Sequence, residues 1–120
     1  MAVIRNLDQG TVIVQHAQVA NGSLQRAVGL LGRASIGVEE ALVLPRCASI
    51  HTWFMRFPID VVFLRQGMVV KLVPALGAFR LASSWEADSV VELASGTIDR
   101  AGLCVGHQLA VEGENGRQEP

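Results

Sequence analysis

Short apolar runs separated by turn residues dominate the chain, and most of them have the two-residue period of strands. "AVIR" and the alternating "TVIVQHAQVA" flank the turn sequence "DQG", which predicts a hairpin around residues 8–10. A second hairpin is predicted within "IDVVFLRQGMVVKLVPAL", with its turn at Gln66 and Gly67. The segments "ALVLP", "IHTWFM", "SVVELA" and "HQLAVE" have the composition of further short strands.

The period changes after Asn21 and Gly22. Apolar residues at 24, 27, 28 and 31 fall on one helical face, Ser23 can cap the start, and Gly32 can end the last turn, so we expect the main helix over residues 24–31. Thr97 can cap a single helical turn over residues 97–101, before Gly102. The segment 77–88 has no clear period and is expected to be an irregular surface loop.

These elements predict an α+β domain that is rich in strands. We expect a small antiparallel barrel or sandwich-like domain of about six to eight short strands, because closure removes exposed sheet edges. A chain of 120 residues fits one domain, which we place at residues 1–112. Residues 113–120 contain almost no apolar side chains and are predicted to form a disordered tail.

Charge and composition exclude several functional classes. Ten Lys and Arg against eleven Asp and Glu give a formal net charge of −1, and the arginines are scattered singly, so neither a nucleic-acid interface nor a basic membrane-binding surface is expected. The N-terminal residues lack the apolar core of a signal peptide, and no segment is apolar enough to span a bilayer, which makes the cytoplasm the expected location. A zinc site would need more cysteines and histidines at short spacing than the two and three present here, and no zinc pattern occurs, so no metal site and no cofactor are predicted.

The candidate chemistry gathers in "CASIHTWFMRFPIDVVF", residues 47–63. On a regular strand one face would carry alternate side chains from residue 51 onward, and these could line a shallow groove with an arginine from the helix end and residues of the irregular loop. Such a set suits a planar or anionic ligand or a peptide, by stacking and forked hydrogen bonds. The candidate binding residues are His51, Trp53, Met55, Arg33, Arg80 and Trp85. The alternative is that Trp53 and Met55 belong to the core, since one sequence does not assign a strand face to the inside or the outside.

The remaining polar residues of this stretch have a structural interpretation. Thr52, Arg56 and Asp60 are expected to hold the corner at Pro58, with Asp60 either paired with Arg56 or accepting hydrogen bonds from turn amides. A catalytic alternative uses Cys47, His51 and Asp60 as a small hydrolytic or redox site. On a regular strand, however, Cys47 and His51 would lie about 13 Å apart. The pair Cys104 and His107 makes a weaker case.

Three blocks of the chain resemble, in order, the DUF192 family of uncharacterised small bacterial and archaeal proteins. They are "RAVGLLGR", "CASIHTWFMRFPIDVVF" and "VVELASGTIDRAGLCVGHQL". The resemblance implies a compact, barrel-like, strand-rich domain with one helix, and it supplies no mechanism. Two departures lie in the last block. This chain has Gly106-His107 where the family usually reads Gly-Asp, which removes a carboxylate that could accept turn amides, and it has "ELASGT" where many members have "ELPAGT".

Three functional hypotheses follow. The first is a non-catalytic accessory module, monomeric or weakly dimeric, that binds a small molecule or a protein partner through the surface of residues 51–60. The second is the small enzyme built on Cys47, His51 and Asp60. The third is a purely structural interaction module without a pocket.

Overall fold

The computed structural model describes residues 2–20 and 33–113. The predicted helix over residues 24–31 lies outside these residues, as do residues 114–120 of the predicted tail. Residue 113, the first residue of that predicted tail, is instead the last residue of a strand.

Nine strands and one short helix make up the described part of the chain. They are β1 (Ala2–Asn6), β2 (Thr11–Val19), β3 (Glu40–Pro45), β4 (Ser49–His51), β5 (Ile59–Arg65), β6 (Met68–Leu76), β7 (Leu81–Ser83), β8 (Ser89–Ala94), α2 (Thr97–Arg100) and β9 (Leu109–Gly113). The strand-rich α+β class is confirmed, with one more strand than the upper end of the expected range.

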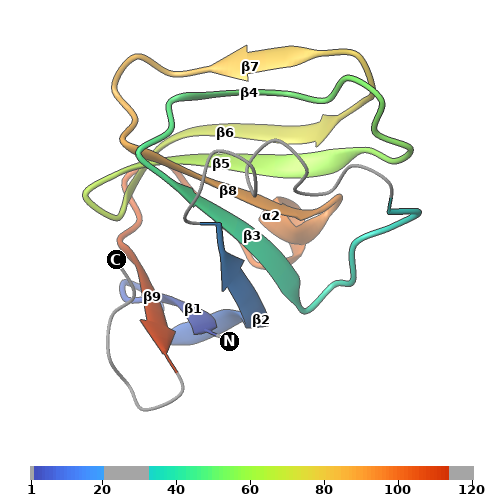
Figure 1. Cartoon of the computed structure of the whole chain (residues 1–120). Coiled ribbons are helices and arrows are strands. Elements are labelled where there is room, and N and C mark those ends of the chain that lie inside the picture. Colours follow the sequence, from blue (N-terminus) through green and yellow to red (C-terminus); the bar gives the residue numbers. More distant parts are fainter. Residues whose placement is uncertain (1, 21–32, 114–120) are drawn as a thin grey trace.

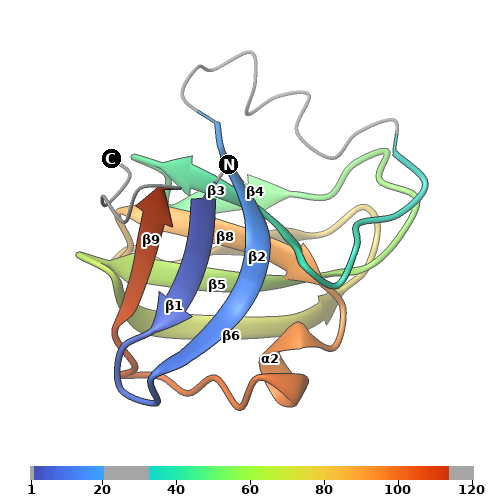
Figure 2. The ribbon, with the colours of Figure 1, turned by 90° about the horizontal axis from the view of Figure 1, so that it is seen from below.

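Seven strands form one sheet that curls into a half-barrel, in the order β6-β5-β8-β3-β2-β1-β9 (Figure 1; Figure 2). Both predicted hairpins, β1–β2 and β5–β6, are present as antiparallel pairs. β2 and β3 pair in parallel, contrary to the expectation of a purely antiparallel sheet. The two outer strands approach each other at one end, where the Val69 N–H donates to His107 O at 2.9 Å and the Leu109 N–H donates to Gly67 O at 2.8 Å.

A separate two-stranded sheet, β4 and β7, packs against the outside of the half-barrel. Figure 1 shows it on the far side of β5 and β6 from β1, β2 and β9. Ile50 of β4 and Ala82 of β7 point inward and join an apolar cluster with alternate side chains of β5 and β8. The other alternate side chains of these strands, such as Val62 and Leu93, belong to a second cluster inside the half-barrel. β5 is therefore buried on both faces, in agreement with its four consecutive apolar residues 61–64.

The expected loop over residues 77–88 contains a strand, which corrects that prediction. β7 is only three residues long and pairs with β4 through His51↔Leu81, Ile50↔Ala82 and Ser49↔Ser83. Only Ala82 of β7 points inward, and a strand with one inward residue is too short to show a two-residue period in the sequence.

Candidate functional site

The regular strand expected from residue 50 to residue 55 ends at His51. Thr52 is fully buried, and its hydroxyl donates to Gly77 O at 2.5 Å and accepts the Arg80 N–H at 2.9 Å. Its backbone also bonds the second loop, with the Thr52 N–H donating to Arg80 O and the Phe79 N–H donating to Thr52 O. These bonds clamp the turn after β4 to the turn before β7.

The clamp brings five exposed side chains together, which we call the aromatic patch: His51, Trp53, Phe54, Phe79 and Leu81. The His51 and Trp53 rings stack with centroids 4.7 Å apart, and the His51 Nδ1 accepts the Trp53 N–H at 3.4 Å. Phe54 and Phe79 meet edge to face with centroids 5.5 Å apart. Leu81 lies directly opposite His51 in the strand pair.

Two residues of the aromatic patch have strained backbones. Phe54 and Phe79 have φ angles of 68° and 59°, in a left-handed region that costs a bulky residue about 1–3 kcal/mol. Phe54 is nevertheless 76 % exposed, so burial of its own ring does not offset that cost. Sequence reasoning missed three residues of the patch. It placed Phe54 on the opposite strand face from His51, and it assigned Phe79 and Leu81 to an irregular loop without singling them out.

The other predicted binding residues are distributed differently. Met55 is only 7 % exposed and belongs to the outer apolar cluster, which corrects its expected place in a groove. Trp85 is 92 % exposed but follows β7 at the Ser83 end, away from the His51 and Leu81 end. Arg80 lies between Phe79 and Leu81 in the chain and is exposed.

Arg33 is engaged in the loop before β3. Its guanidinium donates to Glu40 Oε1 at 2.9 Å, and the Gly37 N–H donates to the same oxygen at 2.7 Å. The Gly37 amide, followed by the Arg33 guanidinium, lowers the pKa of Glu40. No described contact joins Arg33 to the aromatic patch.

Asp60 lies inside the half-barrel, where it holds two elements together. It is fully buried, and its carboxylate accepts the Ala75 N–H at 2.9 Å, the Gly96 N–H at 3.1 Å and the Ile98 N–H at 2.8 Å. It thus caps α2, whereas the Thr97 side chain, the expected cap, makes no capping bond. Arg56 makes no ion pair with any described residue. Of the two roles considered for Asp60, pairing with Arg56 or accepting hydrogen bonds from backbone amides, the structure shows the second.

The residues of the catalytic alternative do not meet. The Cys47 thiol donates to Ser49 O at 3.1 Å, His51 stacks on Trp53, and the Asp60 carboxylate is on the inner side of the sheet. Within the described ranges no group of three metal-ligating side chains is present. No helix in the described part of the chain is long and apolar enough to cross a membrane.

In the last turn, a ring nitrogen of His107 takes the place of the family's carboxylate as a hydrogen-bond acceptor. Its Nδ1 accepts the Cys104 N–H at 3.2 Å and lies 3.0 Å from the Asn6 Nδ2, an amide that donates. The imidazole therefore satisfies a turn amide, which was the role expected for the missing aspartate. Its engagement leaves no free Nδ1 for a pair with the Cys104 thiol.

Glu92 is a buried acid that sequence reasoning placed on an alternating strand and gave no special role. It lies on β8 beside Leu42 and Val61 and is 7 % exposed, and its carboxyl makes no hydrogen bond to a described residue. Burial raises the pKa of Glu92 to about 7. The signal in the sequence is a lone carboxylate within "VVELA".

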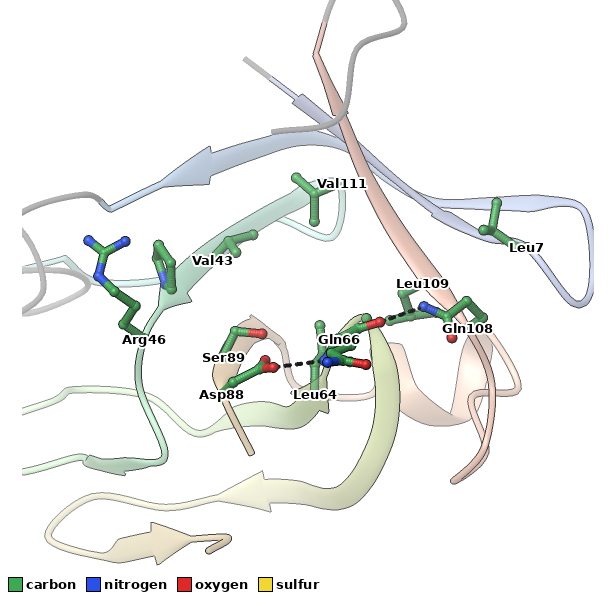
Figure 3. Close-up of a pocket in the computed structure, with 12 residues that line it drawn as sticks. Leu7, Val43, Arg46, Leu64, Gln66, Asp88, Ser89, Gln108, Leu109 and Val111 are labelled. Carbon is green, nitrogen blue, oxygen red and sulfur yellow. Dashed lines mark hydrogen bonds between the residues drawn. The ribbon is translucent and has the colours of Figure 1, made fainter. Parts of the chain in front are cut away.

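The larger of two described cavities lies elsewhere, at the mouth of the half-barrel opposite α2. Figure 3 shows its lining residues, which come from the ends of β3, β5, β8 and β9, and its volume is about 580 Å³. None of the predicted binding residues lines it.

Solved structures with the same fold support this architecture. A protein from Sinorhizobium meliloti, provisionally described as a transcription regulator, superimposes with a TM-score of 0.77 at 20 % identity, covering 92 % of this chain and 91 % of the other. A protein of unknown function from Novosphingobium aromaticivorans gives a TM-score of 0.74 at 18 % identity, covering 90 % and 81 %. No curated protein matches the sequence.

The sequence profile of DUF192, a family described only as uncharacterised, matches residues 4–111. That range contains every described strand at least in part, together with α2 and the aromatic patch. The chain therefore belongs to the DUF192 family.

Proposed function

We propose that this protein is a non-catalytic binding module whose aromatic patch recognises an acidic segment of a partner protein that also carries apolar side chains. The observation that carries the proposal is the exposure of four large apolar side chains, Trp53, Phe54, Phe79 and Leu81, at one end of the β4–β7 sheet. Contiguous exposed apolar side chains on a small domain typically mark an interaction surface. Aromatic residues are also enriched among the residues that dominate binding energy.

Backbone strain supports the same interpretation. Two phenylalanines are held in the left-handed region by the hydrogen bonds of Thr52, and their rings project into solvent rather than into the core. Strain of this kind persists where the surrounding structure enforces it, and it concentrates at ligand-contacting sites. A clamped surface also loses little conformational entropy on binding.

Charge favours an acidic partner. Arg56 and Arg80 flank the aromatic residues in the chain, both are exposed, and neither forms an ion pair with a described residue. No acidic residue lies between residues 47 and 59 or between residues 61 and 85. Acidic groups on a partner would meet these arginines while its apolar side chains cover the rings.

A protein segment suits this surface better than a small molecule does. The two described cavities lie at the mouth of the half-barrel and beside α2, and no residue of the aromatic patch lines either of them. Exposed rings outside these cavities offer a small molecule little enclosure, whereas a peptide can cover several rings at once. The transcription-regulator description belongs to the neighbour from Sinorhizobium meliloti, and the net charge of −1 does not favour direct contact with nucleic acid here.

Peptide display tests the proposal and selects the partner's binding segment in the same experiment. A library of natural protein segments is selected on the wild-type protein and, in parallel, on a variant with Trp53→Ser and Phe79→Ser. We expect segments rich in Asp or Glu and in large apolar residues to be enriched on the wild type and lost on the variant. Trp85→Ser is the matched control, because it removes a ring that is even more exposed and lies outside the patch. Enrichment that survives the double substitution, or enrichment of basic segments, contradicts the proposal.

A further inference from the structure

A second binding site lies at the open mouth of the half-barrel, at the opposite end of the sheet from α2. The cavity of about 580 Å³ falls within the range of roughly 300–1,000 Å³ that is usual for small-molecule sites. Four strand ends surround it, and the hydrogen bond from the Leu109 N–H to Gly67 O closes the ring between β6 and β9. The mouth is thus built from strand ends that hydrogen bonds hold together.

The floor and one side of the mouth are apolar. Val43, Leu64 and Leu109 belong to the inner core cluster, and the partly buried Val111 packs against it. Leu7 adds an exposed apolar side chain from the β1–β2 turn (Figure 3). A ligand seated here would cover side chains that already form the end of the core, and the removal of this apolar surface from water favours binding.

The opposite side carries a row of polar groups that are held in place. The Gln66 N–H donates to Asp88 Oδ2 at 2.9 Å, and the Gln108 side-chain amide donates to Gln66 O at 2.8 Å (Figure 3). These bonds leave Asp88 Oδ1 and Gln108 Oε1 without a hydrogen bond to any described residue. Both uncommitted atoms are acceptors, and one of them belongs to a carboxylate.

We propose that the mouth binds a small amphipathic molecule with a compact apolar body and a primary amine head group. The body covers the valine and leucine side chains, and the ammonium donates to Asp88 and Gln108. A charge-assisted bond to a carboxylate is about twice as strong as a neutral one, so an amine is preferred over a hydroxyl. Arg46 also lines the mouth, but Figure 3 shows its guanidinium directed away from Asp88.

Three probes with one apolar body and different head groups test this proposal. They are 1-adamantanemethylamine, 1-adamantanemethanol and 1-adamantanecarboxylate, titrated into ¹⁵N-labelled protein and followed by amide chemical shifts. We expect saturable shifts at Gln66, Asp88, Ser89 and Leu109, with affinity falling in the order amine, alcohol, carboxylate. Shifts confined to Gly96, Ile98 and Cys104 place the probe in the shallower depression beside α2 and overturn the proposal. An absence of saturable shifts also overturns the proposal.

Matched variants separate the head-group contact from the apolar contact. Asp88→Asn keeps an oxygen for the Gln66 N–H and should weaken the amine about tenfold while leaving the alcohol within about twofold. Asp99→Asn removes the same charge on α2, at the other end of the half-barrel, and should change neither affinity. Val111→Trp fills the mouth and should weaken the binding of all three probes. If that variant does not fold, Leu7→Trp fills the mouth from an exposed position and should have the same effect. Tightest binding of the carboxylate, or an amine affinity unchanged by Asp88→Asn, overturns the assignment of the head group.

Discussion

Glu92 makes the stability of this protein fall as the pH rises. The carboxyl is 7 % exposed, lies between Leu42 and Val61 on the neighbouring strands, and has no hydrogen-bond partner among the described residues. Burial penalises the charged form and raises the pKa of Glu92 from 4.5 to about 7. The folded state therefore holds a proton that the unfolded chain has already released.

The sign and the size follow from linkage. Between the unfolded pKa of 4.5 and the folded pKa of about 7, the folded protein binds more protons than the unfolded chain, so raising the pH destabilises it. One pKa unit corresponds to about 1.4 kcal/mol, which gives a loss of about 2 to 3 kcal/mol between pH 5 and pH 8. Below about pH 4.5 Glu92 is protonated in both states and does not make stability depend on pH. Above about pH 7 nearly all of its destabilising effect is present.

Glu92→Gln isolates this effect, because the amide has nearly the same shape and does not titrate. Urea unfolding of both proteins at several pH values between 5 and 8 gives the difference in their free energies of unfolding at each pH. We expect that difference to change by about 2 to 3 kcal/mol in favour of the variant as the pH rises. Glu86→Gln, an exposed position, should show no such change. A difference that is constant with pH, or one that turns in favour of the wild type, refutes the account of Glu92 as a buried acid without a hydrogen-bond partner in the described part of the chain.

Three further substitutions test the polar contacts that shape the fold, each by urea unfolding against the wild type. Asp60→Asn replaces one carboxylate oxygen with an amide that repels a backbone N–H, and we expect a loss of about 3 kcal/mol; a loss below about 1 kcal/mol contradicts the capping role. Thr52→Val leaves the Arg80 N–H without its side-chain acceptor and should cost about 1–3 kcal/mol, with Ser as the control that keeps the hydroxyl. Gly67→Ala should also destabilise by about 1–3 kcal/mol, because φ is +82° and the added Cβ would lie 2.8 Å from Leu109 O; an unchanged midpoint argues against this turn geometry.

The hydrophobic pattern predicted the strands whose neighbours follow closely in the chain. The two hairpins were readable because their signals are local: turn residues and apolar arms on either side. The parallel pairing of β2 and β3 was not readable, since it depends on a crossover through residues 20–39. Family resemblance reinforced the fold prediction and was confirmed over residues 4–111.

Long-range contacts explain what the sequence did not reveal about the candidate sites. The alternation after β4 breaks because Thr52 bonds a turn about 25 residues away, and that clamp turns Phe54 outward and Met55 inward. The mouth gathers Val43, Leu64, Asp88 and Gln108 from four separate segments, and no local pattern joins them. His51 and Trp53, by contrast, were identified correctly as neighbours because they are two residues apart.

Fluorescence of Trp53 offers the most direct test of the aromatic patch as a binding surface. The chain has two tryptophans, so Trp85→Phe leaves Trp53 as the single reporter at the patch, where it is 46 % exposed. On addition of an acidic, apolar segment selected by peptide display, we predict a saturable blue shift of its emission, abolished by Phe79→Ser. An emission maximum that does not move while the segment binds, or a shift that Phe79→Ser leaves unchanged, contradicts the proposal that the patch is where this protein meets its partner.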